Sequence, residues 1–168
     1  MTIIATTRRS LSWALRIGCA VHVIHTFFYE ISETQGESML PTLNYSGDFV
    51  HTNKLCARGR GCQVGDMIVA LKPTDPAQRV CKRITGMPGD IIAVDPSVDF
   101  KENRGKEPAY IKVPEGHCWV TGDNLSRSLD SRSYGVLPLG LVKGKIVAVN
   151  TRDGAFQWLG NSLKPAED

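Results

Sequence analysis

The sequence predicts a mostly β domain preceded by one N-terminal helix. Two observations support this fold class. Beyond residue 35, short runs rich in valine and isoleucine alternate with Gly-Asp, Pro-Gly and Asp-Pro turns. Before that point, residues 11–29 are predominantly apolar over nearly the length that crosses a bilayer. We therefore expect a helical targeting and membrane-anchor segment at 1–33, a β domain at 34–152 and a C-terminal tail at 153–168.

The N-terminal segment has mixed character. Arg16, His22 and His25 interrupt the apolar run at 11–29, and no acidic residue appears before Glu30. An arginine-bearing, acid-free segment is typical of mitochondrial targeting, whereas a secretory signal has a purer apolar core and a cleavage site with small residues. We favour an uncleaved anchor helix with such targeting character. The alternative is an amphipathic helix that packs on a partner or lies in the membrane interface.

The β domain is expected to contain short antiparallel strands. TGMPGD at 85–90 lacks the glycine spacing of a nucleotide-binding loop, and its Pro-Gly pair is typical of a tight turn between strands. The polar stretch 96–108 is expected to form a long exposed loop. The expected strands are residues 48–55, 66–71, 79–85, 90–94, 110–113, 118–121 and 141–149.

Composition excludes several functional classes. The hydrophobic content of 42% and the charged content of 22% are those of a globular protein. A net charge of +3 without a basic run gives no indication of nucleic-acid binding. The five cysteines form no CxxC pair, so a structural zinc site is not expected. Free thiols are favoured, although Cys56 and Cys62 could pair in an oxidising compartment.

A serine in GESMLPTL, at 36–43, is a candidate nucleophile. A serine hydroxyl needs a neighbouring base to take its proton, and otherwise Ser38 is an ordinary turn residue. Of the four histidines, two lie in the N-terminal segment. The others, His51 and His117, have no catalytic pattern around them and are more simply structural.

Lys82 is the better candidate for the base. In RVCKRIT, strand alternation places Val80, Lys82 and Ile84 on one apolar face. Burial there disfavours the charged amine and lowers its pKa. A drop of about 3 pKa units, roughly 4 kcal/mol, would make the lysine a usable base near neutral pH. The alternative is a surface lysine whose amine extends into solvent.

A polar segment at 122–135, GDNLSRSLDSRSYG, follows a predicted strand directly. Ser126, Ser128 and Ser131 supply hydroxyls, and Asp130 can pair with a neighbouring arginine. The segment is either an ordinary polar turn or a rigid loop that holds a hydroxyl against the lysine amine.

Taken together, these stretches resemble the type I signal peptidase family of membrane serine proteases. Each piece is weakly specific, but five in the family's order, with the serine first and the lysine on a later strand, are specific. Within the family, the chain is most similar to the fungal mitochondrial inner membrane protease branch. The matching pieces are ESMLPTL at 37–43, GDFV at 47–50, GDMIVA at 65–70, CKRITGMPGD at 81–90 and GDNLSRSLDSRSYG at 122–135.

The resemblance implies a signal-peptidase-type β domain with assigned roles at matching positions. Ser38 is expected to be the nucleophile. Lys82 is expected to be the general base in acylation and then the acid that protonates the leaving amine. Ser128 matches a serine that hydrogen-bonds the lysine, and Asp130 and Arg132 match an ion pair that braces the site.

Other positions concern the substrate and the oxyanion. Met39 and Pro41 are expected to contribute to substrate binding. Many bacterial members carry a serine hydroxyl two residues before the nucleophile, where this chain has Gly36. The oxyanion is therefore expected to rely on backbone N–H groups, that of Ser38 first.

The resemblance also implies a cellular setting. We expect an enzyme of the mitochondrial inner membrane that faces the intermembrane space and removes sorting peptides from precursor proteins with small or polar residues before the cut. Its expected partners are a second catalytic subunit and a small accessory subunit, with no metal or cofactor. The alternatives are a bacterial-type signal peptidase at another membrane and a non-catalytic membrane scaffold. A self-cleaving repressor would need a DNA-binding helix-turn-helix, for which there is no room.

Overall fold

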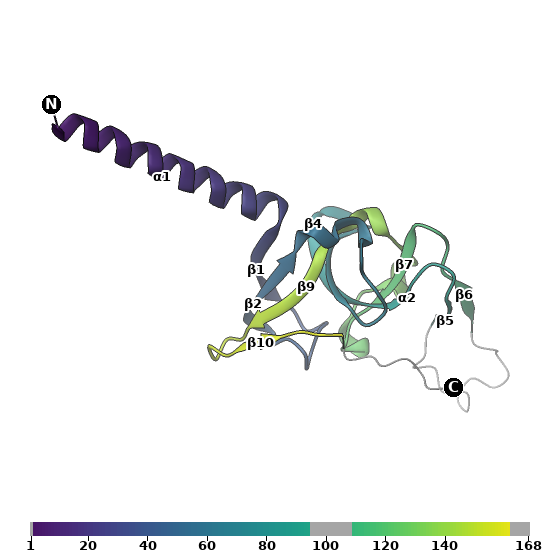
Figure 1. Cartoon of the computed structure of the whole chain (residues 1–168). Coiled ribbons are helices and arrows are strands. Elements are labelled where there is room, and N and C mark those ends of the chain that lie inside the picture. Colours follow the sequence, from purple (N-terminus) through teal and green to yellow (C-terminus); the bar gives the residue numbers. More distant parts are fainter. Residues whose placement is uncertain (1, 95–108, 162–168) are drawn as a thin grey trace.

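The computed structural model describes residues 2–94 and 109–161, with the backbone alone for residues 2–10. The whole loop expected at 96–108 and the end of the expected tail lie outside these residues. Figure 1 shows one long helix that projects away from a β domain. The α-helices of the described residues are α1 (Thr2–Phe27) and α2 (Ser131–Tyr134), and short 3₁₀ helices lie at Lys54–Gly59, Leu125–Arg127 and Leu139–Leu141. The strands are β1 (Tyr29–Gln35), β2 (Ser46–Asn53), β3 (Met67–Lys72), β4 (Asp75–Gly86), β5 (Ile91–Ala93), β6 (Tyr110–Lys112), β7 (His117–Thr121), β8 (Leu137–Pro138), β9 (Val142–Asn150) and β10 (Phe156–Trp158).

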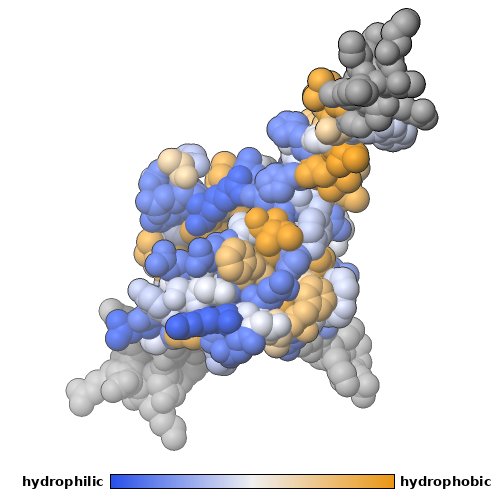
Figure 2. Space-filling model, turned by 90° about the vertical axis from the view of Figure 1, so that its left-hand side faces the viewer, coloured by the Kyte–Doolittle hydropathy of each residue, from blue (hydrophilic) through white to orange (hydrophobic). Residues whose placement is uncertain are grey.

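The end of α1 is tied to the β domain. Lys54 lies just after β2, and its Nζ donates a hydrogen bond to the His25 carbonyl oxygen at 3.0 Å. Its backbone N–H donates to the Phe28 carbonyl oxygen at 2.9 Å. A lysine at a helix C-terminus satisfies carbonyl groups that have no partner in the helix, and its charge complements the helix dipole. Phe27 and Phe28 are exposed at this junction, where Figure 2 shows apolar side chains between α1 and the domain.

The helix expected at the N-terminus is therefore present. Within the part of the chain that the structure describes, no helix has both the length and the apolar character needed to cross a bilayer.

The main sheet is antiparallel and has the order β1-β2-β9-β3-β4-β7-β8, with β10 also paired to β9. The strand β9 lies at its centre and pairs with β2, β3 and β10. Its sequence, VKGKIVAVN, alternates between buried and half-buried side chains over most of its length, as one face of a pleated strand requires. A separate two-stranded sheet consists of β5 and β6.

Each strand expected from the sequence is present, with its ends shifted by a few residues at most. The strands β1, β8 and β10 were not expected. In the structure α1 ends at Phe27, and β1 begins at Tyr29 inside the segment expected to belong to the anchor helix. The sequence of β1, YEISETQ, has few apolar residues, so its pairing with β2, from Tyr29 opposite Asn53 to Gln35 opposite Ser46, defines it as a strand. The strand β10 lies within the expected tail, and all its residues are exposed.

The sheet separates two apolar clusters. Neighbouring residues of β3 point in opposite directions, so Ile68 and Ala70 join one cluster while Met67 and Val69 join the other. The first cluster lies against β7 and β8, and the second lies under the loop between β1 and β2. This second cluster carries the loop that contains Ser38.

The sheet curves so that its edge strand β1 approaches β4. Arg79 on β4 forms an ion pair with Glu30 on β1 at 2.5 Å, although β1 pairs with β2 and the sheet path runs from there through β9 and β3 to β4. The gap between β1 and β4 is a groove that leads to the residues described next.

Candidate active site

Ser38 lies in a tight loop that follows β1. The loop begins at Gly36, whose φ of 120° is in the range that favours glycine, and the Gly36 N–H donates to the Tyr45 carbonyl oxygen at 2.8 Å. Met39 and Leu43 are almost completely buried, at 3% and 2% exposure, in the second apolar cluster. These two anchors hold the half-buried Ser38 at the mouth of the groove.

Lys82 projects from β4 toward Ser38. Its side chain is buried, at 5% exposure, and its Nζ lies 2.7 Å from Ser38 Oγ within hydrogen-bond distance. Burial lowers the pKa of the Lys82 amine below its usual value, although the negative charges of the nearby Asp130 and Asp123 act to raise it. A buried amine that is readily neutral and touches a hydroxyl can accept the hydroxyl proton.

A cavity of about 230 Å³ opens beside this pair. Its walls come from β1, from the Ser38 loop and from β4. Ser32 and Thr34 of β1 contribute polar side chains, and Val50 and Val69 contribute apolar ones. The cavity can therefore hold a small side chain, while the strands on both sides offer backbone groups to an extended peptide.

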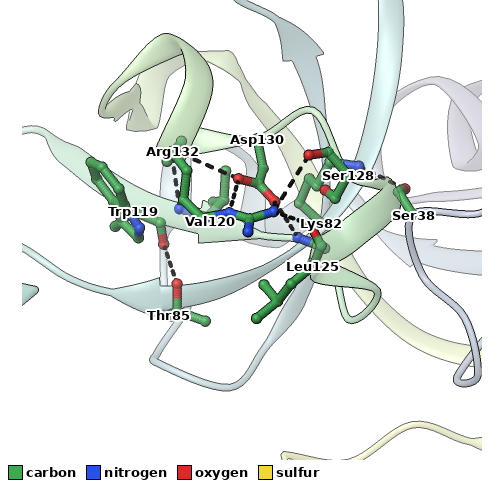
Figure 3. Close-up of polar contacts among 11 residues, drawn as sticks. Ser38, Lys82, Thr85, Trp119, Val120, Leu125, Ser128, Asp130 and Arg132 are labelled. Carbon is green, nitrogen blue, oxygen red and sulfur yellow. Dashed lines mark hydrogen bonds and ion pairs between the residues drawn. The ribbon is translucent and has the colours of Figure 1, made fainter. Parts of the chain in front are cut away.

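Asp130 and Arg132 form a buried ion pair beside Lys82 (Figure 3). Arg132 Nε lies 2.9 Å from Asp130 Oδ1, and Asp130 has 0% exposure. Burial would raise the pKa of Asp130, but hydrogen bonds from Arg132 and from the Gly122 N–H outweigh it and lower the pKa. Asp130 also caps α2 through the Arg132 N–H. The pair therefore connects α2 to the segment that follows β7.

Ser128 lies in the same cluster but does not make the expected hydrogen bond with Lys82. The buried Ser128 Oγ makes no well-formed hydrogen bond within the described residues, although it lies close enough to Asp130 to help lower the pKa of that carboxyl. The hydroxyl lies against Gly122, where it is 2.4 Å from the position that a Cβ would take, and the Lys82 amine is turned to Ser38. The sequence could name Ser128 as a candidate but could not give the orientation of its hydroxyl.

Asn124 and Gly122, which were not predicted from the sequence as site residues, lie against the backbone of Ser38. The Asn124 N–H donates to the Ser38 carbonyl oxygen at 3.0 Å, and Asn124 Nδ2 donates to the Glu37 carbonyl oxygen at 3.2 Å. A Cβ on Gly122 would lie 2.3 Å from the Ser38 carbonyl oxygen, so this position requires glycine. The GDN at the start of the polar segment was the available signal.

Asp123 was also not predicted from the sequence as a site residue. It accepts hydrogen bonds from Arg83 Nε and Nη2, both at 2.7 Å, and another from Thr42 Oγ1. Burial would raise the pKa of Asp123, but these hydrogen bonds lower it. Arg83 directly follows Lys82 on β4, and Thr42 belongs to the Ser38 loop. Asp123 therefore connects the strand of the candidate base to the loop of the candidate nucleophile.

The other residues considered from the sequence are two candidates for substrate binding and two histidines. Met39 lines the cavity, whereas Pro41 is exposed and is not part of its wall. His51 is hydrogen-bonded to Tyr29 and Asn150, and His117 to the Glu115 carbonyl oxygen.

All five cysteines are free thiols, including Cys56 and Cys62. In the described part of the chain, no group of three or more His, Cys, Asp or Glu side chains is arranged to hold a metal ion.

Comparisons with known proteins identify the family of the chain. The sequence model of the family described as signal peptidase, peptidase S26, matches residues 7–98 and 93–150. The chain belongs to the signal peptidase family, peptidase S26. It is a serine endopeptidase of the signal peptidase type, with the mostly β architecture and N-terminal helix described above.

Its similar relatives carry mitochondrial names. The mitochondrial inner membrane protease subunit 1 of Saccharomyces cerevisiae is 55% identical over 159 residues, which cover 91% of this chain and 83% of the relative. The protein of the same name from Schizosaccharomyces pombe is 48% identical, with 80% and 81% covered, and that from Homo sapiens is 37% identical, with 86% and 82% covered. Among solved structures, a signal peptidase I from Enterococcus faecalis V583 has 26% identity and a TM-score of 0.38, covering 49% of this chain and 94% of that chain.

Proposed function

We propose that this peptidase removes sorting peptides from precursor proteins delivered to the mitochondrial intermembrane space, with Ser38 as nucleophile and Lys82 as general base. The observation that carries the proposal is the 2.7 Å contact between Ser38 Oγ and the buried Lys82 Nζ. The names of the similar relatives support the cellular setting.

Acylation begins when the precursor lies extended in the groove with its scissile carbonyl carbon against Ser38 Oγ. Neutral Lys82 takes the hydroxyl proton as the oxygen attacks, and the carbonyl oxygen becomes an oxyanion. The backbone N–H of Ser38 is the donor we assign to that oxyanion, since Gly36 has no side chain to contribute. The C–N bond then breaks, and the protonated Lys82 gives its proton to the leaving amine.

Deacylation uses the same amine. Lys82 is neutral again after the amine has left, so it can deprotonate a water molecule that attacks the acyl carbon of the ester on Ser38. The second tetrahedral intermediate collapses when Lys82 returns the proton to Ser38 Oγ. The free carboxyl end of the sorting peptide is released, and no metal or cofactor takes part in any step.

The neighbouring residues position this pair. We propose that Asp130 and Arg132 keep the loop after β7 rigid, and that Ser128 supports the lysine by packing or by a hydrogen bond formed once the substrate is bound. We also propose that Met39 forms the floor of the substrate cavity, and that Pro41 contacts the substrate at the outer side of the loop.

The chain is expected to work at the inner membrane, with its catalytic domain facing the intermembrane space. We propose that residues 1–33 serve for targeting and membrane attachment, that 34–152 carry catalysis, and that 153–168 form a C-terminal extension. Relatives are named subunit 1 and subunit 2, so we propose a complex with a second catalytic subunit and a small accessory subunit.

A precursor-processing assay with the full-length chain in membranes tests the proposal. Ser38→Ala is expected to abolish processing, and Lys82→Met to slow it about 10²- to 10⁴-fold, the usual contribution of a general base. Ser133→Ala and Lys112→Met are the matched controls, because both side chains are exposed and neither lines the cavity beside the pair. Normal processing by both Ser38→Ala and Lys82→Met would refute the mechanism.

A further inference from the structure

Three charged side chains meet at the end of the groove that is remote from Ser38. Glu30 of β1 forms ion pairs with Arg79 of β4 at 2.5 Å and with Lys54 at 2.9 Å. The Glu30 side chain is 14% exposed, that of Lys54 is 20% exposed, and that of Arg79 is 49% exposed. Arg79 is therefore the member of the cluster that a bound peptide can contact.

The two walls of the groove run in the same direction from this cluster to the catalytic pair. Along β1 the chain leads from Glu30 toward Ser38, and along β4 it leads from Arg79 to Lys82. Arg79 is also one of the residues that line the cavity beside Ser38. Arg79 precedes Lys82 by three residues on one wall, and Glu30 precedes Ser38 by eight on the other, where the last residues form a turn. With about 3.3 Å per extended residue, a peptide held at Ser38 therefore reaches the cluster between these two counts, about four to six residues from its scissile bond.

The position of α1 indicates which side of the scissile bond lies there. Lys54 belongs to the cluster and also caps α1 through the His25 carbonyl oxygen. The remote end of the groove is therefore at the base of α1, the proposed membrane attachment. A sorting peptide that is still held at the membrane reaches the groove from this end, so the peptide to be removed lies along β1 and β4.

The cluster carries a net positive charge. Burial would raise the pKa of Glu30, but hydrogen bonds from Lys54 and Arg79 outweigh it and lower the pKa, so Glu30 is ionised near neutral pH. One carboxylate with two cations leaves one positive charge, and its most exposed part is the Arg79 guanidinium. A guanidinium can bind a second carboxylate while it keeps the first, because it has five N–H donors.

We propose that Arg79, held in place by Glu30, selects for an acidic side chain about four to six residues before the scissile bond and against a basic one there. The inference rests on the proposed function, because it concerns the substrate of the same catalytic pair. It adds a determinant of specificity that is separate from the cavity beside Ser38.

The experiment uses the full-length chain in detergent and a set of fluorogenic peptides. The peptides share one cleavage sequence and differ only by Asp, Asn or Lys placed in turn at the fourth, fifth and sixth residue before the scissile bond. At one of these positions we expect kcat/KM to be about 3- to 10-fold higher for Asp than for Lys, because the attraction of Asp and the repulsion of Lys both contribute to this ratio. Raising the salt concentration should reduce this ratio.

A graded set of variants separates recognition of charge from a structural role. Arg79→Lys should retain the preference, Arg79→Gln should lose it, and Arg79→Glu should reverse it in favour of Lys, with the change mainly in KM. Lys112→Glu makes the same change in net charge on exposed β6 and should leave the ratio as in the wild type. A purely structural role of Arg79 would lower cleavage of all the peptides together and leave the ratio unchanged.

The outcomes are distinguishable. If wild type cleaves the peptides but shows no charge preference at any of the three positions, or if Arg79→Glu keeps the wild-type ratio, the inference is wrong and the proposed function stands. If wild type neither cleaves the peptides nor processes precursors in membranes, the proposed function fails and the inference fails with it. If it processes precursors but cleaves none of the peptides, the same Asp, Asn and Lys series placed in a precursor decides the question. Should Arg79→Glu be unfolded, as thermal unfolding would reveal, Arg79→Gln and Arg79→Lys still decide the question.

Discussion

Replacement of Gly122 by alanine tests whether the loop after β7 positions the nucleophile. A Cβ at this position would lie 2.3 Å from the Ser38 carbonyl oxygen and 2.4 Å from Ser128 Oγ, whereas ordinary contacts begin at 3.4 Å. The Ser128 hydroxyl can rotate away, but Ser128 Cβ, 2.6 Å from the new Cβ, and the Ser38 carbonyl are fixed by their backbones. The backbone of Ser38 must therefore move by about 1 Å, a displacement that typically lowers a catalytic rate about 10²-fold.

The expected result is a kcat that falls about 10²-fold and a free energy of unfolding that falls by about 1–3 kcal/mol, the usual effect of overpacking. Peptide cleavage measures the first quantity, and urea unfolding measures the second. Gly140→Ala is the matched control, because nothing lies within 4 Å of its Cβ. If Gly122→Ala retained kcat/KM within about threefold of wild type, the loop would not position Ser38 and this reasoning would be wrong.

Three further predictions follow from the charges of the site. Because burial lowers the pKa of Lys82, kcat/KM should rise with pH, and the midpoint of the rise should lie below the ordinary lysine pKa of about 10.4. A rise centred on the ordinary value would contradict the assignment of Lys82 as the base. Because the pKa of Asp130 is lowered in the folded state, its contribution to stability should be complete above the unfolded value of about 3.9 and should disappear as pH falls through the folded pKa. Unfolding at a series of pH values should therefore show Asp130→Asn converging with wild type in acid, and a constant difference between the two would count against the prediction. Asp123→Asn weakens the paired hydrogen bonds from Arg83 and should lower the free energy of unfolding, measured in urea, by about 1.5–3 kcal/mol. The control Asp153→Asn, at an exposed position, should have little effect. Equal effects of the two variants would show that the Arg83 contact does not stabilise the fold.

Local sequence signals predicted most of the fold, because most of the strands carry their own pattern. A strand such as β9 alternates between buried and half-buried side chains over most of its length, so its character is visible without its neighbours. The polar β1 alternates in exposure, but its half-buried positions carry Glu30, Ser32 and Thr34, so its sequence shows no apolar face. The short strand β10 is exposed throughout. Both are strands because β2 and β9, respectively, pair with them, and this pairing cannot be read from their own residues.

The site was predicted to a similar extent. Ser38 and Lys82 were recognisable because each lies in a distinctive stretch, and the pattern of β4 placed Lys82 on an apolar face. Asp123 was not recognised, because its role depends on Arg83 and Thr42, which are distant in the sequence. The hydroxyl of Ser128 was expected on Lys82, but its orientation depends on close packing against Gly122.

The sequence alone determined which residues could do chemistry and which segments would be extended, because side-chain type and alternation are local properties. Only the tertiary structure decided that the amine of Lys82 reaches the hydroxyl of Ser38 and that β1 and β4 form the two walls of one groove. Those relations depend on the curvature of the sheet and on packing between residues far apart in the chain, which no local pattern contains.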